Sequence, residues 1–424
     1  MQSRNKLSRR LITIIMLALS ASGLMLSACT SPQQTTDGTS DQAPDTSNQN
    51  PPTEQTDGQE QSPPQRLTLP PFTGEAEREK HRISIVDGKF HVDSGTKPIW
   101  INGVNVAWHR WNDFDSKYDE AWWDNHFAEL RENGVNAARV WINCNNDNGV
   151  IIIDENGMVS GVKDEHWTAL DKFFESAERH GIYMMPTFTS FDHFKSREAE
   201  SWRSMVKSDE AVDSYIEHFT IPFLDRYREN PFLWSIDLMN EPDWVHENAE
   251  CGKLKWSDIS RFFARNAAAI RENSPVLVTV GMAFPKYNAD GSGYEGNKVS
   301  DTFLQNIYPN ENARLDFWSP HYYDWVGRWY GIPFTSSPFG PRSDGGWGLC
   351  DSRPAILAEH SGDGSEGFTI TEDYVNLFNN GWQGAMAWTS NNSGTGDGMG
   401  GMENIGSATR HIAETYPDLI FPLG

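Results

Sequence analysis

Short apolar segments and amphipathic segments alternate along the chain from residue 99 onward. The apolar segments are roughly four to eight residues long, as buried strands are, and the segments between them carry apolar residues at helical spacing. They predict strands at residues 99–106, 135–141, 182–188, 232–239, 276–280, 315–320, 355–358 and 384–388. Eight strands with intervening helices predict an α/β fold, a parallel sheet closed into a (β/α)8 TIM barrel.

A different pattern precedes the first of these strands. Residues 83–92 alternate between apolar and polar positions on either side of Asp87 and Gly88. A period of two around an Asp-Gly pair predicts a β-hairpin. Because this hairpin comes just before the barrel, we expect it to act as a lid on the N-terminal end of the barrel.

The N-terminus has the pattern of an export signal. Several basic residues precede an apolar run at residues 11–26, so residues 1–28 are expected to be a signal peptide. The sequence Leu26-Ser27-Ala28-Cys29 resembles a bacterial lipobox, which implies a lipid on Cys29. Thr30 then favours the outer membrane, facing the periplasm or the cell surface. The alternatives are an uncleaved membrane anchor and simple secretion.

Residues 29–80 are rich in Gln, Thr, Asp, Pro and Ser and have almost no large apolar residue before Leu67. Such a segment cannot bury enough surface to offset its chain entropy, so it is predicted to be a disordered tether. The catalytic domain is then expected at residues 81–424.

The formal net charge is −24, and it becomes −28 without residues 1–28, which contain four basic and no acidic residues. This charge argues against nucleic acid or an anionic membrane surface as a partner and permits a neutral substrate. A solvated acidic surface that keeps the protein soluble explains the charge equally well. We expect a monomer.

Three cysteines remain beside Cys29, and none has the Cys-x-x-Cys spacing of a zinc site, so neither a metal nor a cofactor is expected. Cys251 follows the fourth strand and Cys350 precedes the seventh. Both loops belong near the C-terminal face of the barrel. A disulfide between them is therefore predicted, which leaves Cys144 free.

Two glutamates stand at the ends of predicted strands. Asn240-Glu241-Pro242 ends the fourth strand, and Glu359 ends the seventh. In (β/α)8 barrels the chemistry takes place on the loops that follow the strands. Retaining hydrolysis of a glycosidic bond needs such a pair, because one carboxyl group protonates the leaving oxygen and the other attacks the sugar carbon.

The chain resembles glycoside hydrolase family 5 and its clan over residues 83–420. The resemblance rests on several short motifs that occur in order at strand ends: Ile101-Asn102-Gly103-Val104-Asn105, Arg139, Asn240-Glu241-Pro242, His321-Tyr322-Tyr323, Glu359 and Trp388. It implies that Glu241 is the general acid/base and that Glu359 is the nucleophile.

Four polar residues are expected around this pair. Arg139 would keep the nucleophile ionised, although a structural ion pair inside the barrel is the other interpretation. Tyr323 would donate to the same carboxylate, and Asn240 would hydrogen-bond the sugar 2-hydroxyl. His321 would orient or polarise the acid/base, unless it is a satisfied core histidine.

The chain has 17 tryptophans, many of them in predicted strand-end loops. Because a sugar presents an apolar face of C–H groups on which an indole can stack, some of these should bind substrate. Trp388 is the candidate platform at the cleaved bond, and Trp108 and Trp325 are further candidates. Packing in the core is an equally good explanation for each of the latter two.

These observations predict a retaining endo-acting glycoside hydrolase of a neutral β-1,4-linked polysaccharide. Similarity to mannanase-like members places β-mannan slightly ahead of β-1,4-glucan. An exo-acting β-glycosidase of the same clan is an alternative. A non-catalytic glycan-binding lipoprotein would be a protein of another class, but it would not need both carboxylates.

Overall fold

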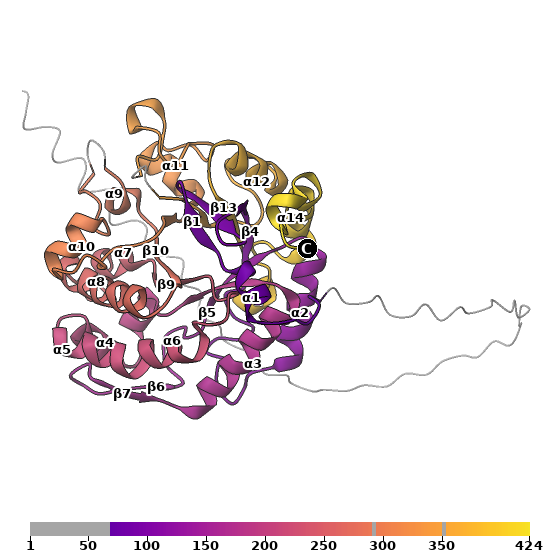
Figure 1. The fold of residues 1–424 in the computed structure, drawn as a ribbon. Coiled ribbons are helices and arrows are strands. Elements are labelled where there is room, and N and C mark those ends of the chain that lie inside the picture. Colours follow the sequence, from indigo (N-terminus) through magenta and orange to yellow (C-terminus); the bar gives the residue numbers. More distant parts are fainter. Residues whose placement is uncertain (1–67, 291–293, 350–352) are drawn as a thin grey trace, which may run out of the picture. The chain divides into compact units, whose positions relative to one another are not determined.

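The central feature of the computed structural model, which describes residues 68–290, 294–349 and 353–424, is a parallel sheet of eight strands. All eight were predicted, so the (β/α)8 barrel is confirmed (Figure 1). In chain order the strands are β4 Ile101–Asn105, β5 Ala137–Trp141, β8 Tyr183–Thr187, β9 Ser235–Asn240, β10 Leu277–Met282, β11 Ser319–Pro320, β12 Leu357–Ser361 and β13 Gly384–Trp388.

The sheet closes between β11 and β12, which are the ends of the hydrogen-bonded strand order. Parallel bridges pair Trp318 with Ala355 and His321 with Glu359. The backbone N–H of Tyr322 also donates to the carbonyl oxygen of Glu359 over 2.8 Å. Closure of the barrel therefore sets His321 beside Glu359.

Helices surround the barrel and begin and end where the sequence signals them. The side chain of Asp119 accepts a hydrogen bond from the Trp122 N–H and caps the first helix after β4. Gly181, with a φ of 66°, ends the helix after β5. The longer helices are α2 Glu120–Glu132, α3 Asp164–His180, α8 Trp256–Asn273, α12 Ile370–Asn379 and α14 Met402–Thr415.

Shorter helices lie between these elements. The segment at residues 209–229 contains α5 Asp209–Tyr215 and α6 Ile221–Tyr227, which a π-helical turn joins. The remaining short helices are α1 Glu75–Arg78, α4 Ala199–Met205, α7 Pro242–Glu247, α9 Pro285–Asn288, α10 Asp301–Ile307, α11 Asp324–Tyr330, α13 Asn392–Thr395 and α15 Pro417–Ile420. No helix in the described part of the chain is both long and apolar enough to cross a bilayer.

The N-terminal hairpin is present. Strands β1 Ser84–Val86 and β2 Lys89–Val92 pair antiparallel around Asp87 and Gly88, which both have positive φ, and β3 Lys97–Pro98 adds a third strand. Phe90 is fully buried, and its ring lies 5.4 Å from the rings of both Trp234 and Phe317 at the base of the barrel. The hairpin thus covers the N-terminal end of the barrel, as expected.

Two features differ from expectation. Residues 68–80, assigned to the tether, pack on the barrel: the Leu69 N–H donates to the Arg179 carbonyl oxygen over 2.9 Å, and Phe72 stacks 6.4 Å from Phe232. The boundary at residue 80 is therefore too late, because the few apolar residues of this stretch are enough to dock it. A small hairpin of β6 Ile151–Ile153 and β7 Val159–Val162, which was not foreseen, follows β5. The signal peptide and Cys29 lie outside the described residues.

Candidate active site

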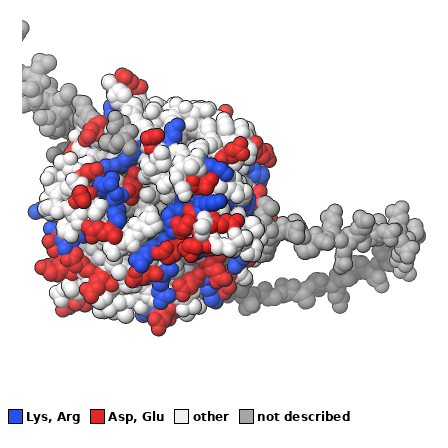
Figure 2. Space-filling model, viewed as in Figure 1, with Lys and Arg blue, Asp and Glu red and all other residues white. Residues whose placement is uncertain are grey.

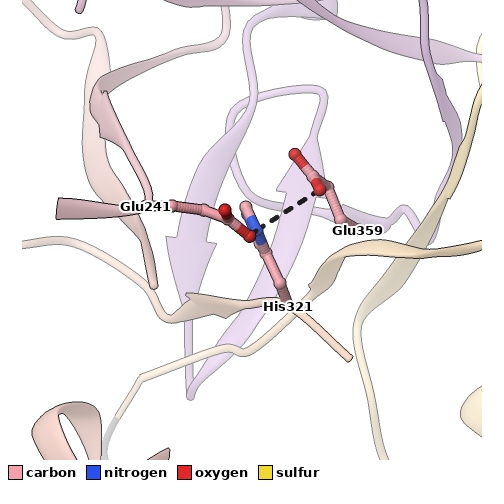
Figure 3. A group of neighbouring side chains, drawn as sticks. All are labelled: Glu241, His321 and Glu359. Carbon is pink, nitrogen blue, oxygen red and sulfur yellow. Dashed lines mark hydrogen bonds and ion pairs between the residues drawn. The ribbon is translucent and has the colours of Figure 1, made fainter. Parts of the chain in front are cut away.

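The two glutamates face each other at the C-terminal end of the barrel (Figure 3). Glu241 directly follows β9 and has a left-handed φ of 49°, and its N–H donates to the Gly281 carbonyl oxygen over 2.8 Å. Glu359 lies within β12. One oxygen of each carboxyl group lies within 4.8 Å of the other. This agrees with the separation of about 5–5.5 Å needed for retention rather than the roughly 6.5–9.5 Å of inverting enzymes.

Arg139 on β5 holds the nucleophile candidate in place. Its side chain is fully buried, and one guanidinium nitrogen donates to Glu359 Oε1 over 2.6 Å. Other N–H groups donate to Asp237, to the side-chain oxygen of Asn105 and to that of Asn240. With its donors directed at protein groups, Arg139 positions Glu359 rather than binding substrate itself.

Asp237 is a site residue that the sequence analysis missed. Its Oδ2 accepts two hydrogen bonds from Arg139, at 2.9 and 2.6 Å, and its Oδ1 accepts from the backbone N–H groups of Gly281 and Met239. It is fully buried within β9. A charged residue inside an apolar strand needs a buried partner, and that was the signal available in the sequence.

His321 lies between the two carboxylates (Figure 3). Its Nδ1 lies 3.0 Å from Glu241 Oε1 and 3.5 Å from Glu359 Oε2. Two acceptors on the same side favour the tautomer with a proton on Nδ1. Burial lowers the pKa of His321 to about 4, so the ring is neutral near neutral pH and bridges the pair as a donor.

Glu241 has the properties of a general acid. Burial raises its pKa to about 7, and a hydrogen bond from Trp244 opposes this rise. The Trp244 Nε1–H donates to Glu241 Oε2 over 2.9 Å. A pKa near neutrality suits a residue that must first give up a proton and then take one back.

The two carboxyl groups are unequal. Burial also raises the pKa of Glu359, and the neighbouring His321 and Arg139 counteract this rise. Arg139 donates directly to Glu359, whereas Glu241 accepts from an indole and an imidazole. Since the guanidinium favours the ionised form of its partner, a single proton shared by the pair resides on Glu241.

Asn240 and Tyr323 are the remaining polar side chains around the two glutamates. A guanidinium only donates, so the contact with Arg139 at 2.9 Å fixes the side-chain oxygen of Asn240 toward Arg139 and leaves its NH2 group available to a sugar hydroxyl. The Tyr323 hydroxyl donates to Glu359 Oε2 over 3.0 Å. The structure thus brings the polar candidates together around the two glutamates.

A cleft of about 340 Å³ opens above the carboxylates. The candidates Trp108 and Trp388 line it, and so do Trp111 and Trp141, with ring centroids of neighbouring indoles 4.7–6.0 Å apart. The Trp388 Nε1–H donates to Asp397 over 2.6 Å, a contact that the sequence did not suggest. A larger hollow of about 710 Å³ lies elsewhere, at residues 68–72, and contains neither glutamate.

Trp325 does not line this cleft. It lies on α11 and contacts Phe284, with ring centroids 5.3 Å apart, in a second aromatic cluster. Cys251 is buried, and its thiol lies 3.7 Å from the Phe191 carbonyl oxygen. Its expected partner Cys350 lies outside the described residues, so the disulfide stays a prediction.

The central group also contains residue types that bind metal ions. Glu241, His321 and Glu359 each place one ligand atom within 4.8 Å of the others. However, Arg139 already supplies a fixed positive charge at Glu359, and a divalent cation at this position would be repelled by it. These side chains are therefore better suited to transferring a proton than to binding a metal ion. The expectation that no metal acts here stays a prediction.

The chain has the fold and the two-carboxylate site of a retaining glycoside hydrolase. No family model matches it. It is 24% identical over 338 residues to a mannan endo-1,4-beta-mannosidase of Mytilus edulis, over 74% of this chain and 89% of that protein. The expected resemblance to family 5 mannanases is thus present in the sequence.

Solved structures show the same fold. A β-mannanase from the blue mussel Mytilus edulis aligns with a TM-score of 0.68 at 22% identity, covering 78% of this chain and 96% of that one. A β-1,4-D-mannanase from Cryptopygus antarcticus gives 0.68 at 20% identity, with 78% and 94% covered.

We expect the pKa of Glu241 to set the alkaline limit of activity. Glu241 must be protonated to donate to the leaving oxygen, so kcat/KM should fall as the pH rises through its pKa of about 7. The profile is measured with an aryl glycoside whose leaving group departs without protonation and with an unactivated oligosaccharide. The parent should show the alkaline fall with the oligosaccharide but not with the aryl glycoside, and Glu241→Gln should keep substantial activity only on the aryl glycoside. If kcat/KM of Glu241→Gln for the aryl glycoside still falls at the same alkaline pH, the assignment of Glu241 as the general acid is wrong.

Asp237→Asn tests the positioning of Arg139. Both carboxylate oxygens accept hydrogen bonds, so an amide NH2 must face a donor on one side, and Arg139 should shift. We expect kcat to fall roughly 100-fold with a smaller change in KM. The acid limb should move to lower pH because a negative charge near Glu359 is lost. The control is Asp363→Asn at an exposed site; equal effects of the two changes would exclude a specific role for Asp237.

Proposed function

We propose that this protein is a retaining endo-β-1,4-mannanase that acts as a monomer on a neutral polysaccharide. The observation that carries the proposal is a pair of glutamates, the partly buried Glu241 and the buried Glu359, whose nearest carboxyl oxygens lie within 4.8 Å of each other and whose environments differ.

The geometry supports a double displacement. In the first step Glu359 attacks the anomeric carbon, while Glu241 protonates the oxygen of the departing sugar. In the second step Glu241, now ionised, takes a proton from water, and the resulting nucleophile releases the sugar from Glu359. Tyr323 and Arg139 hold the attacking carboxylate in place, with hydrogen bonds of 3.0 and 2.6 Å before substrate binds.

The proposed substrate follows from the comparisons and from charge. The relatives with similar sequence and fold are named as mannan endo-1,4-beta-mannosidases or β-mannanases. On the face drawn in Figure 2, acidic and basic side chains are interspersed rather than gathered into a basic patch. Indole rings line the cleft, which suits an uncharged sugar chain.

A panel of polysaccharides tests this function. With mannan, glucomannan, cellulose and xylan as substrates, we expect the fastest release of reducing ends from mannan, as oligosaccharides and with an early fall in viscosity. Glu359→Gln should lose roughly 10⁴-fold or more in kcat, because it keeps the shape and removes the nucleophile. If cellulose is cleaved preferentially, the proposed substrate is wrong and is glucan rather than mannan. If only monosaccharides are released, the enzyme is exo-acting.

We further propose that Cys29 carries the lipid that anchors the enzyme to the cell envelope, in the outer membrane. The lipobox-like sequence and the polar segment that follows it support this idea. A tethered enzyme can reach a polymer too large to import, and several acyl chains on one residue hold a protein firmly.

Cys29→Ser tests the anchor. The parent should sediment with membranes, and the variant should be released from them. If parent and variant are equally membrane-bound, or equally free in the medium, the lipoprotein proposal is wrong.

A further inference from the structure

One loop accepts hydrogen bonds from the indoles of two cleft tryptophans. This loop, residues 389–401, follows β13 and contains α13; it is called the β13 loop below. The Trp108 Nε1–H donates to the Gly394 carbonyl oxygen over 2.8 Å, and the Trp388 Nε1–H donates to Asp397 Oδ2 over 2.6 Å. Because an indole has a single donor, these two side chains offer a ligand their ring surfaces rather than a hydrogen bond.

The carboxylate of Asp397 is itself held in a fixed orientation. Its Oδ1 accepts hydrogen bonds from the Met399 N–H over 3.0 Å and from the Thr395 hydroxyl over 3.2 Å. Its Oδ2 accepts from Trp388. Three donors therefore fix the plane of this carboxylate although the residue is exposed. Since hydrogen bonds to ionised acceptors are stronger than those between neutral groups, the contact at 2.6 Å restrains the indole.

The β13 loop is attached to its surroundings on both sides of Asp397. Before it, the Asn391 side-chain NH2 group donates to the Trp108 carbonyl oxygen over 2.8 Å. After it, the Gly400 N–H donates to Asp363 Oδ1 over 3.1 Å. The loop therefore presents its acceptor from a fixed position.

The remaining contacts of Trp388 are edge-to-face contacts with other rings. Trp388 lines the same cleft as Glu359 and Tyr323. Its ring centroid lies 5.3 Å from that of Trp141 and 6.0 Å from that of Trp108, with interplanar angles of 82° and 74°. These rings limit where the Trp388 indole can lie, and the hydrogen bond at Nε1 sets its rotation within that space.

We propose that Asp397 is a positioning residue, which holds the Trp388 indole at the angle at which its face meets the sugar that Glu359 attacks. This rests on the proposed function and adds to it a residue that acts through the indole rather than on the sugar. The sugar gains positive charge as the glycosidic bond breaks, and an aromatic face attracts positive charge. A misdirected indole therefore lowers kcat more than it raises KM.

A double-mutant cycle tests this role. Asp397→Ala should lower kcat for mannohexaose roughly 10-fold with a smaller change in KM, as expected for the loss of a hydrogen bond to a charged group. Trp388→Phe keeps an aromatic ring and removes the N–H. In the Trp388→Phe background, Asp397→Ala should lower kcat by less than about 2-fold. Equal losses in the two backgrounds overturn the proposal, because Asp397 would then act on the sugar directly or on the whole loop.

Asp363→Ala is the matched control variant. It removes an exposed carboxylate that also accepts a hydrogen bond from the β13 loop, but from the Gly400 N–H rather than from an indole. We expect kcat to stay as in the parent. If Asp363→Ala lowers kcat as much as Asp397→Ala does, the loss comes from a general loosening of the loop and the proposal is wrong.

The hydrogen bond can also be observed directly, in an NMR spectrum of the indole N–H groups. The resonance that disappears in Trp388→Phe belongs to Trp388. It should move upfield in Asp397→Ala, because its strong acceptor is gone, and should stay in place in Asp363→Ala. An unmoved resonance in Asp397→Ala overturns the proposal.

Failure of the proposed function is distinguishable from failure of this role. If the parent cleaves neither mannan nor glucan, the proposed function is wrong and this role is wrong with it. If only the role of Asp397 is wrong, the parent stays active and the double-mutant cycle shows equal losses. If the parent cleaves glucan rather than mannan, cellohexaose replaces mannohexaose in the same cycle.

Discussion

The site depends on one buried cation. Arg139 has no exposed side-chain surface, and moving a guanidinium out of water costs several kcal/mol unless charges and hydrogen bonds replace the lost solvent. Asp237 and Glu359 supply the charges, and Asn105 and Asn240 supply further acceptors. Together with Arg139, these residues come from four strands, so the need to satisfy one cation fixes the ends of those strands relative to one another.

This constraint also makes the two glutamates different. Glu359 is buried and Glu241 has only 13% of its side chain exposed, so desolvation raises the pKa of each. Only Glu359 receives a direct hydrogen bond from the guanidinium. In the proposed mechanism, the position of Arg139 therefore makes one glutamate the attacking carboxylate and the other the proton donor, although the two side chains are chemically identical.

Much of this arrangement could be predicted from the sequence, because parallel barrel strands are apolar runs and their C-terminal ends share one face. The eight strands, the hairpin around Asp87 and the placement of Glu241 and Glu359 at strand ends all follow from such local patterns. The docking of residues 68–80 could not be predicted in this way. Their few apolar residues acquire a role only when α3 and Phe232 supply the surface on which they pack.

The contacts between side chains of the site could not be predicted from the sequence either. Asp237 stands in the same run as Glu241, but its bond to Arg139 joins residues 98 positions apart. Trp325 resembled a cleft residue because it follows β11, yet the turn into α11 carries it to Phe284. Periodicity shows which residues end a strand. It does not show where the following loop directs them.

The pKa of Glu241 depends on burial and on hydrogen bonds, which act in opposite directions and whose strengths change during the reaction. Burial stabilises the protonated form, which the first step requires. The indole N–H of Trp244 and the imidazole N–H of His321, at 2.9 and 3.0 Å, stabilise the carboxylate. Hydrogen bonds to a charged acceptor are stronger than those to a neutral one, so these two contacts strengthen as the proton leaves. The groups that oppose the raised pKa in the resting enzyme thus favour the transition state, and the residue can then act as the base of the second step.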